Sequence, residues 1–218
     1  EIEAKDKEQC TPLHWAAANG HAAAIKVLLD AGAEIEAKDK DQSTPLHKSA
    51  KYGHVQAIQA LLKAGAEIEA KNQWQYTPMH WAAQNGHVEV IKALLKAGAE
   101  IEASGENKNT PLHQAAANGH TSVAKVLLAA GANLDAKNEN RWTPVCFAAY
   151  NGHEGLAREL LDGGAKYDVS SKNRFLHWAA KNGLENGIRV LLALGAEINS
   201  QDDEKKTPLH LASEHGQD

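Results

Sequence analysis

The sequence is short of several residue types, and these shortages exclude some classes of protein. Among 218 residues it has two cysteines, and its formal net charge is −5. Cys10 and Cys146 are far apart in the chain, so we expect free thiols of an intracellular protein, most readily a cytoplasmic one. The acidic balance argues against a nucleic-acid surface, which needs a basic face. No apolar run reaches about 18 residues, so no membrane-spanning helix is predicted, and the charged N-terminus predicts no signal peptide.

What the chain has instead is a repeated motif. Thr-Pro-Leu-His begins at Thr11 and returns, whole or slightly altered, at Thr44, Thr77, Thr110, Thr143 and Thr207. A weaker copy, Arg-Phe-Leu-His, begins at Arg174. The first five copies follow one another at intervals of 33 residues. A fixed period of this length indicates a stack of small units rather than one globule.

Each unit is expected to contain two short helices and a protruding hairpin. In the third copy Thr77 is a good N-cap, Pro78 suits the first helical position, and Gly86 supplies the left-handed residue that ends the helix. A second helix is expected from about 88 to 96, and the alternation of apolar and polar residues over 99–103 predicts a short strand that leads into a turn. Neither helix exceeds about ten residues, so stability must come from the stacking of neighbouring units.

The chain resembles ankyrin-repeat proteins along its whole length. The family pattern Thr-Pro-Leu-His-x-Ala-Ala, then Gly-His, then Leu-Leu-x-x-Gly-Ala is found in almost every unit. The resemblance implies an all-α repeat solenoid of stacked helix-turn-helix units with short β-hairpin fingers. It also implies that a partner binds a concave face built from finger tips and first helices. A further implication is that the repeated histidines form hydrogen bonds to neighbouring backbone.

We predict a single ankyrin-repeat domain over residues 1–218. Its parts are expected to be the finger of a missing repeat at 1–10, six repeats at 11–43, 44–76, 77–109, 110–142, 143–173 and 174–206, and a truncated seventh repeat at 207–218. The first helical unit resembles an internal one, and the last lacks a second helix. We therefore interpret the chain as a segment of a longer array and expect its last unit to fray.

Two departures from the family pattern affect the fingers. The family usually places glycine two residues before the threonine, but here this position carries a side chain, at Gln9, Gln42, Gln75, Lys108, Arg141 and Lys205. The turn must then tolerate a side chain or accept strain. In the sixth unit Phe175 replaces the proline and the N-cap threonine is lost. Its finger, around 169–173, is expected to be stunted or bent.

Large side chains collect at the positions that form the concave face in the family. Counted from the threonine, positions +4, +7 and +8 share one face of the first helix, and the finger tip precedes the threonine. The partner-binding residues predicted from these positions are Trp15, Tyr52, Trp74, Tyr76, Trp81, Gln114, Asn118, Trp142, Phe147, Tyr150 and Trp178. Aromatic side chains are the usual anchors of protein interfaces, and the two amides would hydrogen-bond a partner across the polar fourth repeat. Packing between helix and finger is the alternative role for Trp15, Trp81 and Trp178.

No catalytic, metal or cofactor site is expected. Eleven of the twelve histidines recur at positions +3 and +10 of the repeat, which is the periodicity of the fold. No set of cysteines and histidines has the spacing of a zinc site. Acidic residues recur on fingers and outer helix faces, where solvated charge is the default. Cys146 has no evident activating group, and phosphate-binding and nucleophile motifs are absent.

We therefore predict a non-catalytic scaffold for protein–protein interaction that binds another protein or an extended peptide. No nucleic-acid or membrane partner is expected, and the chain is expected to be a monomer. Three alternatives stay open. They are a structural spacer whose aromatic residues only brace the fingers, a segment that recruits substrate for a larger multidomain protein, and an engineered binder.

Overall fold

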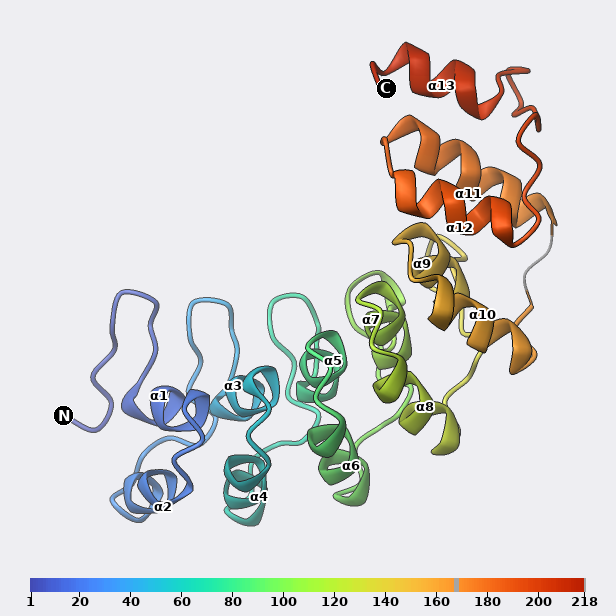
Figure 1. The fold of residues 1–218 in the computed structure, drawn as a ribbon. Coiled ribbons are helices and arrows are strands. Elements are labelled where there is room, and N and C mark those ends of the chain that lie inside the picture. The colour runs from blue at the N-terminus through green and yellow to red at the C-terminus, as the bar shows by residue number, and fades with distance from the viewer. Residues whose placement is uncertain (167–168, 218) are drawn as a thin grey trace. The chain divides into compact units, whose positions relative to one another are not determined.

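The chain folds into pairs of short α-helices joined by loops. The computed structural model describes residues 1–166 and 169–217, without the side chains of 169–171 (Figure 1). The first helices of the pairs are α1 (Pro12–Ala18), α3 (Pro45–Tyr52), α5 (Pro78–Gln84), α7 (Pro111–Ala117), α9 (Pro144–Tyr150), α11 (Val169–Lys181) and α13 (Pro208–Glu214). The second helices are α2 (Ala22–Asp30), α4 (Val55–Lys63), α6 (Val88–Lys96), α8 (Thr121–Ala129), α10 (Glu154–Asp162) and α12 (Glu185–Ala193), and one loop contains the 3₁₀ helix η1 (Glu106–Lys108). The predicted all-α repeat solenoid is confirmed.

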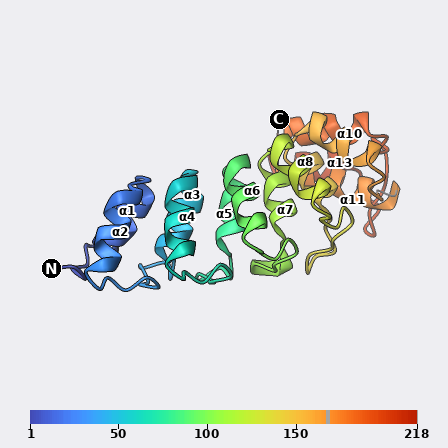
Figure 2. The same ribbon diagram turned by 90° about the horizontal axis from the view of Figure 1, so that it is seen from below.

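Contacts between residues divide the chain into two compact units. Unit 1 comprises residues 1–115 and 122–133, and unit 2 comprises residues 116–121 and the chain from 134 onward. In unit 1, α1 packs on α3 and α3 on α5, while α2 packs on α4 and α4 on α6, so the first helices form one row and the second helices another (Figure 1). Figure 2 shows the helix pairs of unit 1 as successive layers. In unit 2, α9 packs on α10 and α12, and α11 packs on α12 and α13. The single domain over 1–218 stays a prediction.

Most of the first helices begin at a Thr-Pro pair, which fixes the backbone on both sides of the helix start. The N-cap threonine is extended, with φ −85° and ψ 167° at Thr11. Proline disfavours a helical conformation in the residue before it and itself fits the first helical position. The helix then buries one apolar face: Leu13, Leu46 and Met79 are at most 1% exposed. Because these helices are too short to be stable alone, this burial between neighbouring pairs stabilises them.

The histidine at position +3 links the start of a first helix to the finger that precedes the next first helix. In the second repeat the Thr44 N–H donates to His47 Nδ1 at 3.1 Å, and His47 Nε2 donates to the Tyr76 carbonyl of the next finger at 2.9 Å. Because Nδ1 accepts from a backbone N–H, Nε2 carries the proton of the neutral ring. His14 and His80 make the same two bonds, and burial lowers the pKa of His47 and His80 to about 4.

The histidine at position +10 links the second, third and fifth repeats to the repeat before them. His54 Nε2 donates to the Ala18 carbonyl and His87 Nε2 to the Lys51 carbonyl, both at 2.9 Å. The ring lies against the glycine that ends the preceding first helix, because a Cβ on Gly20 would be 2.6 Å from His54 Nδ1. Gly20 also has a φ of +73°, so both the conformation and the space require glycine. The hydrogen bonds expected from the histidines to neighbouring backbone are confirmed for His14, His47, His80 and His177 at position +3 and for His54, His87 and His153 at position +10.

The loops that precede the first helices are fingers without strands. The strand predicted over 99–103 is wrong, because these residues form a turn in which the Ala103 N–H donates to the Glu100 carbonyl at 3.1 Å. A side chain from the preceding repeat, rather than a strand partner, satisfies this backbone: the Glu100 N–H donates to Glu69 Oε1 at 2.8 Å. None of the described residues forms a β-strand, so the short β-hairpins expected for the fingers are replaced by turns.

The position that the family pattern gives to glycine holds a left-handed residue with a side chain. The φ angle lies between 58° and 62° at Gln9, Gln42, Gln75, Lys108, Arg141 and Lys205. An L-residue in this region costs roughly 1–2 kcal/mol. A side chain at the base of the finger holds the turn closed: in the third finger Asn72 Oδ1 accepts the N–H groups of Trp74 at 3.1 Å and Tyr76 at 3.0 Å. The sequence left two outcomes open, a turn that tolerates a side chain and a strained turn. The left-handed φ angles indicate the strained turn.

The sixth repeat differs from the expectation. Helix α11 runs without interruption from Val169 to Lys181, so the stunted finger predicted around 169–173 is wrong. Phe175 stands where most other repeats have proline, and without proline the preceding residue is free to be helical. The preceding repeat has Cys146 in place of the histidine that would reach this finger, and Cys146 Sγ lies 3.2 Å from Thr143 Oγ1. The loss of the finger and the loss of the histidine therefore go together.

The last helix is formed but less covered than its counterparts. In α13 the side chain of Leu209 is 74% exposed, whereas Leu13, at the same position of the first repeat, is fully buried. Helix α13 packs on α11. Fraying of the unit at 207–218 stays a prediction.

Acidification is expected to destabilise unit 1 through the buried histidines. The folded-state pKa of His47 and His80, about 4, lies below the ordinary value of 6.5, so the unfolded chain takes up protons first as the pH falls. The stabilisation is complete above about pH 6.5 and is lost toward about pH 4, and about 2 kcal/mol per histidine is lost between about pH 7 and 5. Urea unfolding at these two pH values measures the loss.

The matched comparison for this prediction is His80→Cys, because Cys146 occupies the same position in the fifth repeat. This variant is expected to be less stable at neutral pH, since it lacks the bond to the Asn109 carbonyl. On acidification it should lose about 2 kcal/mol less than the wild type. An equal loss in both proteins would contradict the assignment to His80.

The strain at the finger tips predicts opposite behaviour of two small substitutions. Gln75→Gly removes the left-handed penalty at a φ of 59°, whereas Gln75→Ala keeps the Cβ and therefore keeps the penalty. The glycine variant is expected to be more stable than the alanine variant by about 1 kcal/mol, after allowance for the greater freedom of glycine in the unfolded chain. Urea unfolding compares them, and equal stabilities would show that this turn is not strained.

Candidate functional site

Three rings of unit 1 form a first cluster, comprising Trp74 and Tyr76 on a finger and Trp81 on α5. The Trp81 ring lies edge-to-face with the other two, at centroid distances of 5.9 Å from Trp74 and 6.2 Å from Tyr76. Tyr76 also stacks on His80 at 5.0 Å, and its hydroxyl accepts a hydrogen bond from Gln114 Nε2 at 2.6 Å. Burial raises the pKa of Tyr76. The finger ring is thereby fixed against both α5 and α7.

An exposed ring lies beside the first cluster. Lys51 Nζ is 4.8 Å from the centroid of the Trp81 ring and 5.7 Å from that of Tyr52, both within the range of cation–π attraction. Tyr52, at the C-terminal end of α3, is 50% exposed. The lysine therefore connects a packed ring on α5 with an exposed ring on α3.

Trp15, on α1, is a second exposed ring of unit 1. Its side chain is 55% exposed, and its Nε1 donates to Asp6 Oδ2 at 2.8 Å. Trp15, Tyr52 and Lys48 line a hollow of about 50 Å³. Lys48 forms an ion pair with the buried Asp39 at 2.5 Å. Trp15 and Lys48, which both occupy position +4, are thus each held by an aspartate of the finger that precedes their helix.

The second cluster lies in unit 2 and comprises Trp142, Phe147, Tyr150, Phe175 and Trp178. Trp142, on the finger, is at its centre, with its ring centroid 4.6 Å from Phe175, 5.2 Å from Phe147, 5.3 Å from Tyr150 and 5.6 Å from Trp178. These contacts are edge-to-face, the geometry that aromatic quadrupoles favour. Phe175 is 1% exposed and Trp178 is 51% exposed. The cluster therefore extends from the core of unit 2 to its surface.

The structure brings most of the predicted binding residues into these two sets, where they differ in exposure. Tyr76, Trp81 and Trp142 contact other rings and are partly covered by them. Gln114 is 8% exposed and holds the Tyr76 hydroxyl. Asn118 is exposed. The predicted set thus contains both displayed side chains and side chains that hold them in place.

Three residues that contact or join the predicted rings, Lys48, Lys51 and Phe175, were not predicted from the sequence. Lys48 and Lys51 lie at positions +4 and +7, the same face as the predicted aromatic residues, and this spacing is the signal that could have found them. Phe175 joins the second cluster. Its signal was the loss of the proline, which marks a repeat that packs differently.

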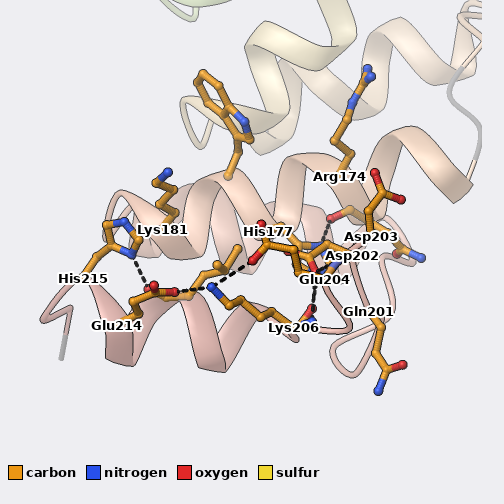
Figure 3. Close-up of a pocket in the computed structure, with 13 residues that line it drawn as sticks. Arg174, His177, Lys181, Gln201, Asp202, Asp203, Glu204, Lys206, Glu214 and His215 are labelled. Atoms are coloured by element: carbon orange, nitrogen blue, oxygen red, sulfur yellow. Dashed lines mark hydrogen bonds and ion pairs between the residues drawn. The ribbon is translucent and has the colours of Figure 1, made fainter.

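A hollow of about 720 Å³ lies between α11, the finger before α13, and α13 itself. Three of its charged groups are paired with one another: Lys206 Nζ lies 2.9 Å from Glu214 and 3.1 Å from Glu204 (Figure 3). Hydrogen bonds to Glu214 and Glu204 raise the pKa of Lys206. Asp202 accepts the N–H groups of residues 204 and 206. These bonds give the carboxylates and the ammonium structural roles.

The described residues contain no group of side chains suited to a metal ion. No three histidine, cysteine, aspartate or glutamate side chains of residues 1–166 and 169–217 are grouped so that they could bind a metal ion. Within the same residues, every helix is too short or too polar to span a lipid bilayer.

Gly105 leaves room for the Tyr76 ring, and this predicts a steric effect. Its φ is −92°, so its conformation does not require glycine, but a Cβ at this position would overlap the Tyr76 ring. Gly105→Ala is expected to reduce the free energy of unfolding by about 1–3 kcal/mol, because the ring must leave its place beside Trp81. Urea unfolding of both single variants and of Gly105→Ala/Tyr76→Ala measures the coupling. The effect should become much smaller without the tyrosine ring, leaving only the contact of 3.0 Å with His80 Nε2, and an unchanged effect would contradict this packing.

Comparisons with known proteins agree with this architecture. A family model described as ankyrin repeats (3 copies) matches residues 1–72, 64–138, 112–202 and 172–218. Rabankyrin-5 of Homo sapiens is 51% identical to the chain over 43 residues, which are 19% of this chain and 4% of that protein. The match therefore spans a small part of the length of this relative. Together, the family model and the stacked helix pairs show that the chain belongs to the ankyrin-repeat family.

Proposed function

We propose that the chain is a non-catalytic module that binds another protein or an extended peptide on its finger loops and first helices. Ankyrin repeats are generally protein–protein interaction modules, and the local similarity to Rabankyrin-5 fits this class. The residues that we assign to the partner are Trp15, Tyr52, Trp74, Tyr76, Trp81, Gln114, Asn118, Trp142, Phe147, Tyr150 and Trp178.

The observation that carries the proposal is the exposure of large rings on first helices. Trp15, Tyr52 and Trp178 are each between 50% and 55% exposed. Exposed apolar surface of this size is unfavourable in water until something covers it. Tryptophan and tyrosine are also the residues that most often carry the binding energy of protein interfaces.

The exposed rings are held in place before any partner arrives. Trp15 is oriented by its hydrogen bond to Asp6, and Tyr52 by the nearby ammonium of Lys51. A side chain that is already ordered loses less conformational entropy on binding. This preorganisation supports a binding role for the two rings of unit 1.

Other members of the assigned set support the surface from behind. Tyr76 and Trp142 pack on helix rings through several contacts. The same contacts favour the spacer alternative, in which the aromatic residues only brace the fingers. The two functions differ in what the exposed rings do, so the test below uses exposed rings alone.

We also propose that the chain acts as a monomer in the cytoplasm and binds neither nucleic acid nor membranes. The net charge of −5 opposes association with nucleic acid and anionic lipid. Cys10 and Cys146 are both free thiols, as in most proteins of reducing compartments.

The test compares Trp15→Ala/Tyr52→Ala with Val27→Ala. Val27, on the second helix α2, is 66% exposed, so its variant removes exposed apolar surface outside the proposed face. Proteins captured by the wild-type chain are purified, and their Kd is measured for each variant. The aromatic variant is expected to bind at least about tenfold more weakly, equivalent to about 1.4 kcal/mol, while Val27→Ala binds as the wild type does.

Stability gives the control for this experiment. Because both rings are half exposed, the melting temperature of the double variant should stay close to that of the wild type. A capture pattern and affinity that do not respond to Trp15→Ala/Tyr52→Ala would reject the assigned face in unit 1. A large fall in melting temperature together with unchanged capture would favour the spacer.

A further inference from the structure

A hollow in unit 2 has aromatic walls and, among the described residues, no acidic side chain in its lining. It has a volume of about 210 Å³ and is lined by Asn140, Trp142, Arg174, Phe175 and Trp178. An apolar cavity of about 150 Å³ is enough to hold benzene, whereas pockets for drug-sized ligands begin at about 300 Å³. The hollow therefore fits a single aromatic or large aliphatic side chain.

This hollow arises from the irregular sixth repeat. Because Phe175 replaces proline, α11 continues back to Val169, and Arg174 lies within the helix instead of at its N-cap. Arg174, Trp178 and Lys181 are then spaced by four and three residues and share one face of α11. Other repeats, which begin their first helix at Thr-Pro, have no cation in this place. The Trp142 finger forms the opposite wall.

Among the described residues, no carboxylate forms an ion pair with either of the two cations beside the hollow. Arg174 Cζ lies 5.5 Å from the centroid of the Phe175 ring, and neither Arg174 nor Lys181 forms an ion pair within the described part of the chain. The neighbouring acids Glu204 and Glu214 are bound to Lys206. Figure 3 shows Arg174 and Lys181 on the same side of their helix, and Lys181 is near enough to Glu214 for the two charges to interact without forming an ion pair. This face of α11 is therefore cationic with an aromatic centre.

We propose that the hollow binds an apolar side chain of an acidic peptide segment, with flanking carboxylates paired to Arg174 and Lys181. The side chain inserts beside the Trp142 and Trp178 rings, which bury it from water. The carboxylates of the peptide form ion pairs with these two cations of α11. The inference rests on the proposed function and deepens it, because it names the chemistry of the partner.

Single-stranded nucleic acid is the other ligand that aromatic and cationic side chains can bind. The surroundings favour the peptide. Asp203, Glu204 and Glu214 line the adjoining hollow, and their charges repel a continuous phosphate backbone. A peptide with only a few carboxylates next to its anchor avoids that repulsion. Nucleic acid is therefore an outcome to be tested.

The experiment uses the whole chain with ¹⁵N-labelled tryptophan, whose indole N–H resonances report on each ring separately. The probe is a capped seven-residue peptide with a central phenylalanine and glutamate on both sides. Matched probes replace the phenylalanine by alanine or the glutamates by lysines, and oligothymidylate serves as the nucleic-acid probe. The acidic phenylalanine peptide is expected to shift the resonances of Trp142 and Trp178, with affinity that falls as salt rises.

The variants Arg174→Glu and Arg189→Glu form the matched pair. Arg174→Glu should weaken the peptide about fivefold or more, because it replaces an attraction by a repulsion at an exposed site. Arg189, on α12, is an exposed arginine paired with Glu185, and its variant should bind as the wild type does. Circular dichroism checks that both variants keep their helices.

Several results would overturn the inference. They are an absence of shifts at Trp142 and Trp178 with millimolar peptide, equal binding of the lysine peptide, no effect of Arg174→Glu, or tighter binding of oligothymidylate at the same rings. Trp15→Ala/Tyr52→Ala should leave the peptide titration unchanged, because those rings belong to unit 1. Failure of the unit 1 assignment and failure of this inference are therefore separate results.

Discussion

The stack depends on a histidine ring that bonds the backbone at both ends of a repeat at once, at its N-cap and at its finger. In the second repeat His47 accepts the N–H of its own N-cap threonine and donates to the Tyr76 carbonyl of the next finger. Each bond satisfies a backbone group that would be costly to leave unpaired at a buried position. Helices of seven to nine residues have little stability of their own, so the spacing of the repeats must come from such bonds and from apolar packing. The same bond fixes the base of the finger, and with it the rings that the finger carries.

The irregular part of the chain follows from the same constraint. Where the histidine is replaced by Cys146, the next repeat has no finger carbonyl at the usual place, because α11 occupies those residues. Phe175 permits this longer helix and packs against Trp142 at 4.6 Å. The contact of Phe175 with Trp142 thus connects α11 to the finger before α9, in the part of the chain where Cys146 replaces the histidine. The longer helix also brings Arg174 onto a helix face next to exposed Trp178, which is how a structural change creates a surface with new chemistry.

Local signals in the sequence were sufficient for the helix starts, the buried apolar faces and the histidine bonds. The turns at the fingers were not predictable in this way. The alternation over 99–103 is the same for a strand and for a turn whose N–H is satisfied by Glu69, 31 residues before its partner Glu100. Likewise, the length of α11 depends on how Phe175 packs in three dimensions. For the candidate site, position in the repeat identified the face, but it did not separate Gln114, which is buried against Tyr76, from displayed side chains.

Binding and stability share residues on this face, and this has a physical consequence. In the second cluster the exposed Trp178 contacts Trp142, which in turn contacts the buried Phe175. A partner that covers Trp178 therefore acts on a continuous set of rings that reaches the core of unit 2. Because a ligand that binds only the folded state stabilises it, occupation of this surface should stabilise the irregular repeat, whose connection to its neighbour lacks the histidine. The surface around Trp178 departs most from the repeat pattern, and a partner bound there should therefore give the largest increase in stability.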